Sequence, residues 1–258
     1  MKRLLPLLML LLGITLQACN SNSPNNSGLT NEELAWLRKT TVENLVFVKG
    51  GTFMEGDVGY EDENGEHHLF GGRNCKPLHE VTLESYSMLK YEVSFKEFHL
   101  FLKATKRKAF KSREGSIHVQ PHLPANYLIW QEANDYCEWL AKVLNLPISL
   151  ASESQWEYAA RSRGLAVEHA TDNGKIDNDI NLKGIKGPLE GFPSGHFPPN
   201  PLGIYDMTGS RYEWTKEKVV RGVGASHASI YHRSFHALEN TGAKGIRLVV
   251  NSSKAIKK

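Results

Sequence analysis

The sequence has 258 residues, of which 40% are hydrophobic and 23% charged, which suits one large or two small globular domains. This composition excludes a wholly disordered chain. With 31 basic and 28 acidic side chains the formal charge is only +3, which excludes a nucleic-acid-binding protein that holds phosphates on a basic face. The 3 Cys are too few for a disulfide-dense scaffold or a zinc module with four thiolates, whereas the 11 His leave a metal site open.

The first residues indicate a targeting segment. Lys2 and Arg3 precede an apolar run, residues 4–16, of about 13 residues, which is shorter than the ~20 that a helix needs to cross a bilayer. Residues 1–18 are therefore predicted to be a signal peptide. The run ends in the letters LQAC, which resemble the lipobox of bacterial lipoproteins, so that Cys19 is expected to be acylated as the new N-terminus. The alternative is a plain signal peptide followed by an ordinary cysteine.

A lipid on Cys19 would hold the protein at a membrane outside the cytoplasm. Each buried CH2 contributes ~0.8 kcal/mol, so more than one acyl chain anchors a protein stably. The next residue is Asn20 and not the Asp that resembles an inner-membrane retention signal, which favours the outer membrane, with the domain facing the periplasm. Residues 19–30 are rich in Asn and Ser and are expected to be the lipidated Cys followed by a flexible tether.

The next elements are expected to be a helix, two strands and a long loop. Residues 31–39 should be helical, because acids occupy the first turn and bases the last. Residues 45–48 are rich in strand-forming side chains, and residues 80–84 alternate as a half-buried strand does. Residues 57–76 form a loop with many acidic, His and Gly residues. It is either a solvated excursion or a cation site, although its acids do not have the regular spacing of a calcium loop.

Three helices are expected in the middle of the chain. Ser94 and Glu97 form a capping box at the start of the first, and Ser152 with Gln155 forms the same box at the start of the third. Between them, residues 131–145 have the clearest helical period of the sequence. Its apolar positions are Ala133, Tyr136, Cys137, Leu140, Ala141 and Leu144.

Two further features concern the cysteines and the second half. In an oxidising compartment Cys75 and Cys137 could form a disulfide, but Cys137 lies on the apolar helix stripe, so burial as a thiol is the favoured interpretation. From residue 165 onward Gly, Pro and Asn interrupt every period, which predicts a coil-rich segment with a few short strands. Residues 251–258 should be a frayed basic tail.

Six segments, in this order, resemble the formylglycine-generating enzyme family, also called the sulfatase-modifying-factor domain. They are residues 47–56 (FVKGGTFMEG), 77–83 (PLHEVTL), 91–94 (YEVS), 130–140 (WQEANDYCEWL), 152–161 (SESQWEYAAR) and 199–214 (PNPLGIYDMTGSRYEW). The last two are similar to the family's TEAEWEYAAR and PNxxGLYDMxGNxxEW. The resemblance implies one compact α+β domain, residues 31–250, of C-type-lectin-like character with little regular secondary structure.

The resemblance also bears on catalysis. The family's reaction depends on two cysteines, downstream of an Arg-Gly-Gly-Ser type turn, that bind copper and activate oxygen. The corresponding stretch, residues 221–233, contains no cysteine, so the resemblance implies a chain without the catalytic pair. His227 and His232 fall near those positions and His236 follows, so an imidazole metal site is the alternative, although no carboxylate stands at ligand spacing near them. Glu213 is a further candidate metal ligand.

Other family positions suggest structural roles. Glu213 matches a family calcium ligand, but Ser210 replaces the Asn that accompanies it, so calcium stays an open possibility and no other cofactor is expected. Carboxylates such as Glu157 and Asp206 are expected to accept hydrogen bonds from buried backbone N–H groups. Trp156 and Trp214 are expected to fill the core.

Without the cysteine pair the sequence favours a pseudoenzyme, a lipid-anchored periplasmic protein that uses the former active-site face to recognise another protein. The partner would be a secreted antibacterial effector, with this chain as the immunity protein, or a component of envelope or secretion machinery. The candidate binding residues are Tyr212, Arg221, His227, Tyr231, His232, Arg233 and His236. The alternatives are a metal-dependent oxidoreductase of the same superfamily with His ligands, and a carbohydrate-binding protein that uses Tyr212 and Tyr231.

Overall fold

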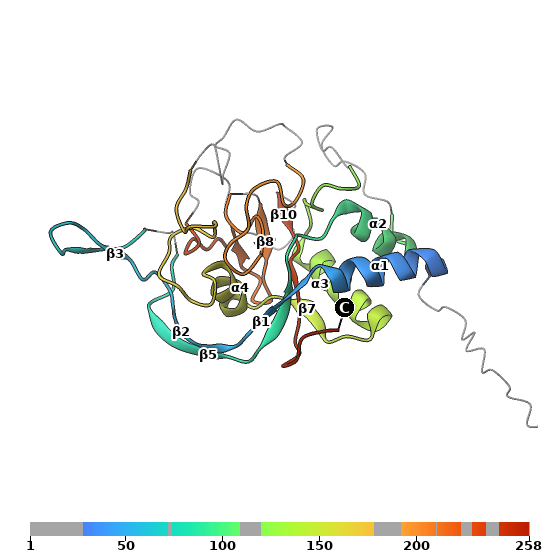
Figure 1. The fold of residues 1–258 in the computed structure, drawn as a ribbon. Helices are drawn as coiled ribbons and strands as arrows, with labels where there is room; N and C mark the ends of the chain where they lie inside the picture. The colour runs from blue at the N-terminus through green and yellow to red at the C-terminus, as the bar shows by residue number, and fades with distance from the viewer. Residues whose placement is uncertain are drawn as a thin grey trace, which may run out of the picture.

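The structure, a computed structural model, describes residues 28–71, 74–108, 120–177, 192–209, 211–222, 229–235 and 243–257. In chain order the elements are α1 (Asn31–Glu43), β1 (Leu45–Val48), β2 (Gly51–Glu55), β3 (Tyr60–Glu61), β4 (His67–His68), β5 (His79–Leu83), β6 (Tyr86–Leu89), α2 (Phe95–Ala104), α3 (Trp130–Leu144), β7 (Ile148–Leu150), α4 (Glu153–Ala160), β8 (Tyr212–Trp214), β9 (Val220–Arg221), β10 (Lys244–Gly245) and β11 (Leu248–Val250). The expected α+β domain with little regular structure is confirmed (Figure 1).

A four-stranded antiparallel sheet, in the order β1-β6-β11-β7, separates two hydrophobic clusters. Successive side chains of a strand point to opposite faces of its sheet. In β11, Leu248 and Val250 accordingly pack in one cluster and Val249 in the other. All three are buried because both faces of the sheet are covered.

Helices α1, α2 and α3 lie together on one side of this sheet (Figure 1). The capping box of α2 is confirmed: the Ser94 hydroxyl accepts from the Glu97 amide, and the Glu97 carboxylate accepts from the Ser94 amide. The apolar stripe of α3 is buried as its period predicts. Helix α1 is longer than expected and continues to Glu43, because Thr41, one turn after Leu37, is buried on the same face.

Helix α4 lies in the second cluster, next to the small sheet β10-β8-β9. The capping box of Ser152 and Gln155 is present at its start, and Trp156 is completely buried. The second half of the chain has the coil-rich character expected. The turn that begins at residue 201 is held by the Asn200 side-chain oxygen, which accepts from the amides of Leu202 and Ile204.

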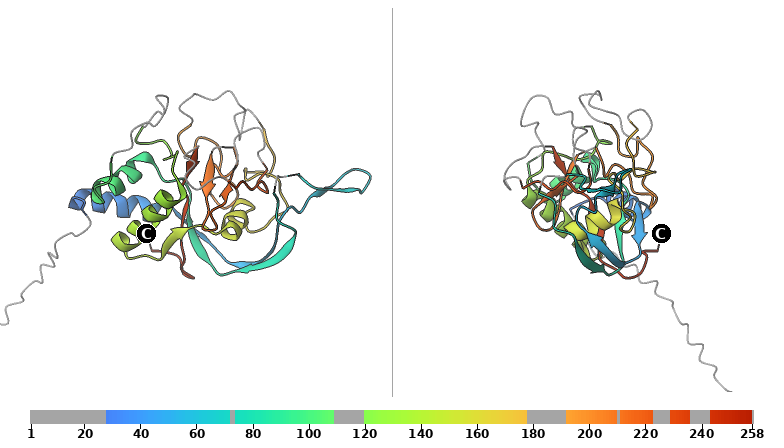
Figure 2. Two further views of the ribbon diagram at one scale, coloured as in Figure 1. Left: turned by 180° about the vertical axis from the view of Figure 1, so that it is seen from behind. Right: turned by 90° about the vertical axis from the view of Figure 1, so that its left-hand side faces the viewer.

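The loop expected at residues 57–76 contains a hairpin. Strands β3 and β4 pair antiparallel, with Tyr60 opposite His68 and Glu61 opposite His67. Gly59 precedes them with φ +60, where a Cβ would lie 2.2 Å from the His68 carbonyl oxygen, so only glycine fits. The hairpin extends away from the rest of the domain beyond the curved ribbon of β2 and β5 (Figures 1 and 2).

Two observations concern the ends of the described chain. The tail expected after residue 250 starts with residues that contact the domain, since the Asn251 side chain bonds to Gln155 and Ser149, and Ile256 packs on the first cluster. Among the described residues, none of the helices has the length and apolar character to cross a membrane. The signal peptide, Cys19 and the tether lie outside the described residues.

Candidate functional site

Helix α4 presents two carboxylates, one turn apart, to the end of β9. Glu153 and Glu157 are at i and i+4 and therefore share a face of the helix. The Arg221 guanidinium is fully buried between them and donates to Glu157 Oε2 at 2.9 Å and to the Ile230 carbonyl at 2.8 Å. Its second nitrogen lies 3.4 Å from Glu153 Oε2. After it Gly222 has φ +74, and a Cβ there would meet the Arg211 carbonyl at 2.8 Å.

Glu157 also ties α4 to β2. Its Oε1 accepts from the Gly56 amide at 2.8 Å and from Arg161 at 2.9 Å, and Arg161 donates in turn to the Met54 carbonyl at 2.7 Å. Burial acts to raise the pKa of Glu157, but Arg221 and these donors outweigh it and lower the pKa overall. The expectation that this carboxylate satisfies a buried backbone N–H is confirmed. Arg161, at i+4 from Glu157, completes a charged face of one short helix.

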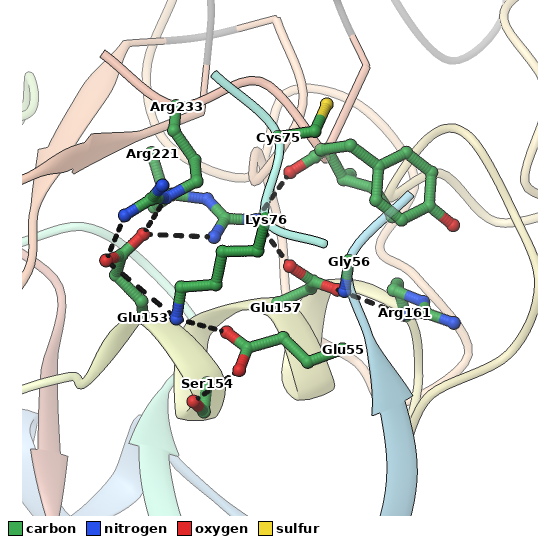
Figure 3. Close-up of polar contacts among 12 residues, drawn as sticks. Glu55, Gly56, Cys75, Lys76, Glu153, Ser154, Glu157, Arg161, Arg221 and Arg233 are labelled. Atoms are coloured by element: carbon green, nitrogen blue, oxygen red, sulfur yellow. Dashed lines mark hydrogen bonds and ion pairs between the residues drawn. The ribbon is translucent and has the colours of Figure 1, made fainter. Parts of the chain in front are cut away.

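The network reaches the surface through Glu153. Arg233 donates to both oxygens of Glu153, with NH2 at 2.8 Å from Oε1. Lys76 lies between Glu153 and Glu55 (Figure 3), with Nζ 2.7 Å from Glu55 Oε1 and 3.9 Å from Glu153 Oε1. Burial raises and these cations lower the pKa of Glu153, with a net lowering. Each carboxylate among the described residues of this network is paired with a cation. We call this network, which joins α4 to β2 and β9, the clamp; its members are Glu55, Lys76, Glu153, Glu157, Arg161, Arg221 and Arg233.

The thiol of Cys75 lies beside the clamp. Its position in the sequence does not predict this. Cys75 precedes Lys76 (Figure 3), and its sulfur is 3.8 Å from Asp57 Oδ2. Burial, with the Asp57 charge next, raises the pKa of Cys75 to about 11. Cys137 is buried in the other hydrophobic cluster, where burial raises its pKa as well. The two are not joined by a disulfide, which confirms the interpretation of Cys137 as a buried thiol.

The thiols of Cys75 and Cys137 do not fit the two-cysteine copper site of the formylglycine-generating enzyme family, which the sequence resembles. Cu(I) requires two thiolates close together. Cys75 and Cys137 belong to different core clusters, and both are held in the protonated form by burial. The third cysteine of the sequence, Cys19, lies outside the described residues. The described thiols therefore do not fit a copper pair.

The structure corrects the expected positions of three binding residues, Arg221, Tyr231 and His232. Arg221 is buried because its guanidinium is neutralised by α4, and Tyr231 is buried with its hydroxyl donating to the Val167 carbonyl at 2.8 Å. Neither can contact a partner or a sugar at the surface. His232 is also buried, at 8% exposure, whereas Arg233 and Tyr212 are partly exposed. His227, His236 and Ser210 lie outside the described residues.

Glu213, the candidate metal ligand, is part of a second buried ion pair. Arg247 donates to both Glu213 oxygens at 2.8–3.0 Å, and the Trp156 indole N–H donates to Oε2 at 2.7 Å. A calcium ion at Glu213 would have to displace a fully buried guanidinium, so this carboxylate does not fit a cation site. Trp156 and Trp214 are core residues, as expected, and Asp206 accepts from the Gly195 amide at 2.6 Å.

The structure shows two other polar clusters, the first of them in the loop that the sequence leaves open as a cation site. In the hairpin, ligand atoms of Asp62, Glu66 and His68 lie within 4.8 Å of one another, but these side chains are largely exposed, and Asp62 mainly caps the turn. Between α1 and the start of α2 a cavity of about 180 Å³ is lined by Glu92 and Glu97. Burial raises the pKa of Glu92 to about 8. In the sequence Glu92 and Glu97 do not differ from exposed acidic residues, so their burial is seen only in the folded structure.

Comparison with known proteins supports the fold and the family. Serine/threonine-protein kinase pkn1 of Chlamydia caviae is 26% identical over 67% of this chain, but the match spans only 27% of that protein. Inactive C-alpha-formylglycine-generating enzyme 2 of Bos taurus is 26% identical over 67% of this chain and 70% of its own length. Chaperone protein LppX of Paenibacillus barcinonensis is 25% identical over 69% of this chain and 72% of its own length.

Among solved structures, PvdO from Pseudomonas aeruginosa superposes with a TM-score of 0.65 and 25% identity, covering 80% of this chain and 93% of that one. Residues 30–250 match the sulfatase-modifying factor enzyme 1-like domain. That match covers most of the sequence and includes α4, β9 and the carboxylates and arginines of the clamp. The chain therefore belongs to the sulfatase-modifying factor enzyme 1-like, or formylglycine-generating enzyme-like, domain family.

Proposed function

We propose that the chain is a non-catalytic, lipid-anchored periplasmic protein that recognises another protein. Cys19 carries the lipid and holds the domain at the outer membrane, and neither a metal nor another cofactor takes part. The partner is a secreted antibacterial effector, against which the chain acts as an immunity protein, or a component of envelope or secretion machinery.

The observation that carries this proposal is the state of the thiols. The segment after Arg221 has no cysteine in the sequence, and the cysteine beside the clamp, Cys75, has its pKa raised to about 11. A thiol is a metal ligand and a nucleophile only as the thiolate. At neutral pH this site offers a charged clamp without thiolate chemistry. A relative whose name calls it inactive, and another named a chaperone, are consistent with a binding role for such a domain.

The surface next to Arg233, where the clamp reaches the outside of the protein, supplies the recognition residues. We define the Arg233 rim as Lys76, Leu78, His79, Arg233 and Phe235. Arg233 is fixed by Glu153 and by the Asn74 carbonyl, 3.1 Å from NH1, and its guanidinium lies 5.0 Å from the centre of the Phe235 ring. Phe235 is 62% exposed. A preordered Arg beside an exposed aromatic ring is the combination that dominates binding energy in many interfaces.

Site-specific photocrosslinking in intact cells tests the proposal. A photoreactive phenylalanine derivative replaces Phe235, and the same derivative replaces Ala35, an exposed residue of α1, as the control. We expect one protein to be captured from position 235 and not from position 35. No protein adduct from position 235, with the chain present at the outer membrane, would contradict the recognition function.

Elemental analysis of the purified protein separates this proposal from a His-liganded oxidoreductase. A binding protein should retain less than about a tenth of an equivalent of copper, iron or zinc after reconstitution and dialysis, because the candidate ligand Glu213 is committed to Arg247. One equivalent of a transition metal that is lost in a His227→Ala, His232→Ala variant would favour the enzyme instead.

A further inference from the structure

The hairpin at residues 57–71 projects from the domain on the side away from α1 (Figures 1 and 2). Its strands β3 and β4 are only two residues long. An isolated hairpin of this size is not stable in water, so that its shape depends on contacts made elsewhere. Two sets of contacts hold it in place.

The first set is at its base. The carboxylate of Asp57 accepts from the backbone amides of Gly59, Phe70 and Gly71 at 3.0–3.2 Å, which joins the outgoing and returning chains. Asp57 itself is buried. One side chain thus satisfies three backbone donors and fixes the direction in which the hairpin leaves the domain.

The second set is a row of rings. The buried Tyr231 stacks on Phe70 with ring centres 5.6 Å apart and planes at 10°. Phe70 contacts Tyr60 at 5.3 Å, and Tyr60 contacts His68 at 5.5 Å. Aromatic pairs at such distances contribute about 0.5–1.5 kcal/mol each beyond their burial. The row runs from the core to the hairpin, so the hairpin is preordered.

This preordered element exposes apolar side chains. Leu69 is 63% exposed and Tyr60 is 49% exposed. Tyr60 lies opposite His68, so the alternation of side chains places Leu69, the next residue, on the other face of the hairpin, which it shares with Glu61. The same residues 57–71 contain no Lys or Arg. Besides the buried Asp57, their acidic residues are Glu61, Asp62, Glu63 and Glu66.

We propose that this hairpin is a docking element for a protein whose surface carries Lys and Arg side chains around a shallow apolar depression. The inference rests on the proposed recognition function and adds a second contact, with its chemistry, to the Arg233 rim. Leu69 fills the depression, and the carboxylates of Glu61, Glu63 and Glu66 face the basic residues. A preordered hairpin loses little conformational entropy on binding, and complementary charge at the edge of an interface speeds association.

Photocrosslinking from position 69 is the first experiment. The intact anchored protein carries a photoreactive phenylalanine derivative at Leu69, alongside the position 235 and position 35 proteins. We expect the protein captured from position 235 to be captured from position 69 as well. Capture at 235 but not at 69 would overturn the hairpin inference and leave the recognition function standing, whereas capture at neither would remove both. Capture of a second copy of this chain would also overturn the inference.

Affinity for the identified and purified partner is the second experiment. The variant Glu61→Gln, Glu63→Gln, Glu66→Gln removes three exposed carboxylates and leaves Asp62, which caps the turn, unchanged. The matched control is Glu43→Gln, Glu84→Gln, Glu138→Gln, which removes three exposed carboxylates elsewhere. For the hairpin variant we expect binding at low salt to be at least about fivefold weaker, because each exposed ion pair contributes little and three are lost together. For the control variant we expect a change of less than about twofold, because its carboxylates lie outside the proposed contact.

Salt and side-chain size complete the test. The difference between the two triple variants should shrink as ionic strength rises above 0.15 M, where the Debye length is about 8 Å. Leu69→Ser should weaken binding about tenfold at all salt concentrations, with urea unfolding unchanged because the side chain is exposed. Equal binding by the two triple variants, or no effect of Leu69→Ser, would overturn the proposal.

Discussion

Replacing Arg247 by Met should destabilise the protein more than any change on its surface. Arg247 is fully buried and donates to both oxygens of Glu213, to the carbonyls of Leu89 and Lys90 at 3.0 Å, and to that of Tyr205 at 2.9 Å. Methionine keeps the volume but leaves the Glu213 charge uncompensated. Breaking a buried pair from one side costs about 3–5 kcal/mol, a large part of the 5–15 kcal/mol that stabilises a typical domain.

Urea unfolding with a fixed m-value measures this loss. The control is Arg107→Met, which breaks the pair with Asp135 at the surface, where the arginine is 41% exposed, and should cost less than about 1 kcal/mol. Adding Glu213→Gln to Arg247→Met should restore part of the stability, because it removes the buried charge. A loss for Arg247→Met no larger than for Arg107→Met would refute the argument that this pair stabilises the core.

Three further outcomes follow from local chemistry. Because the pKa of Cys75 is about 11, iodoacetamide at pH 8 should modify it at least tenfold more slowly than the unfolded chain, as measured by mass spectrometry. Because the pKa of Glu92 is about 8 and that of an unfolded Glu about 4.3, the folded state binds the extra proton between them; the free energy of unfolding should therefore fall from pH 5 to 8, and less so in Glu92→Gln. Ser94→Ala removes the cap of α2 and should cost about 1 kcal/mol in urea unfolding, against almost nothing for the exposed Ser253→Ala.

The sequence was sufficient for features that depend on neighbouring residues. The capping boxes at Ser94 and Ser152 and the apolar stripe of α3 are confirmed, because a cap needs partners three residues apart and a stripe needs only the helical period. The α+β character was available from the family segments. The helix α1 ends at Glu43 and not at the expected residue 39, because its end is set by the burial of Thr41, a contact with the rest of the fold.

The sequence was insufficient where a side chain finds its partner far along the chain. Arg221 meets Glu157, 64 residues earlier, and Arg233 meets Glu153, 80 residues earlier. The resemblance to the family predicts Arg221 on the former active-site face, as a binding residue. The position of Cys75 beside the clamp likewise depends on how the segment before β5 crosses α4. The one local signal was the i, i+4 spacing of the α4 acids, which places both on one face.

The clamp contacts both ends of residues 221–233, the stretch that corresponds to the cysteine-bearing stretch of the family. Glu153 fixes Arg233 directly and lies 3.4 Å from Arg221, whose closer carboxylate partner is Glu157. Glu153→Gln should therefore loosen these ends, with amide exchange at residues 229–231 at least tenfold faster, while Glu84→Gln changes nothing. Unchanged exchange in Glu153→Gln would mean that other contacts hold the segment. If the described residues 229–233 depend on Glu153, one carboxylate of α4 fixes the position of Arg233, as the proposed recognition surface requires.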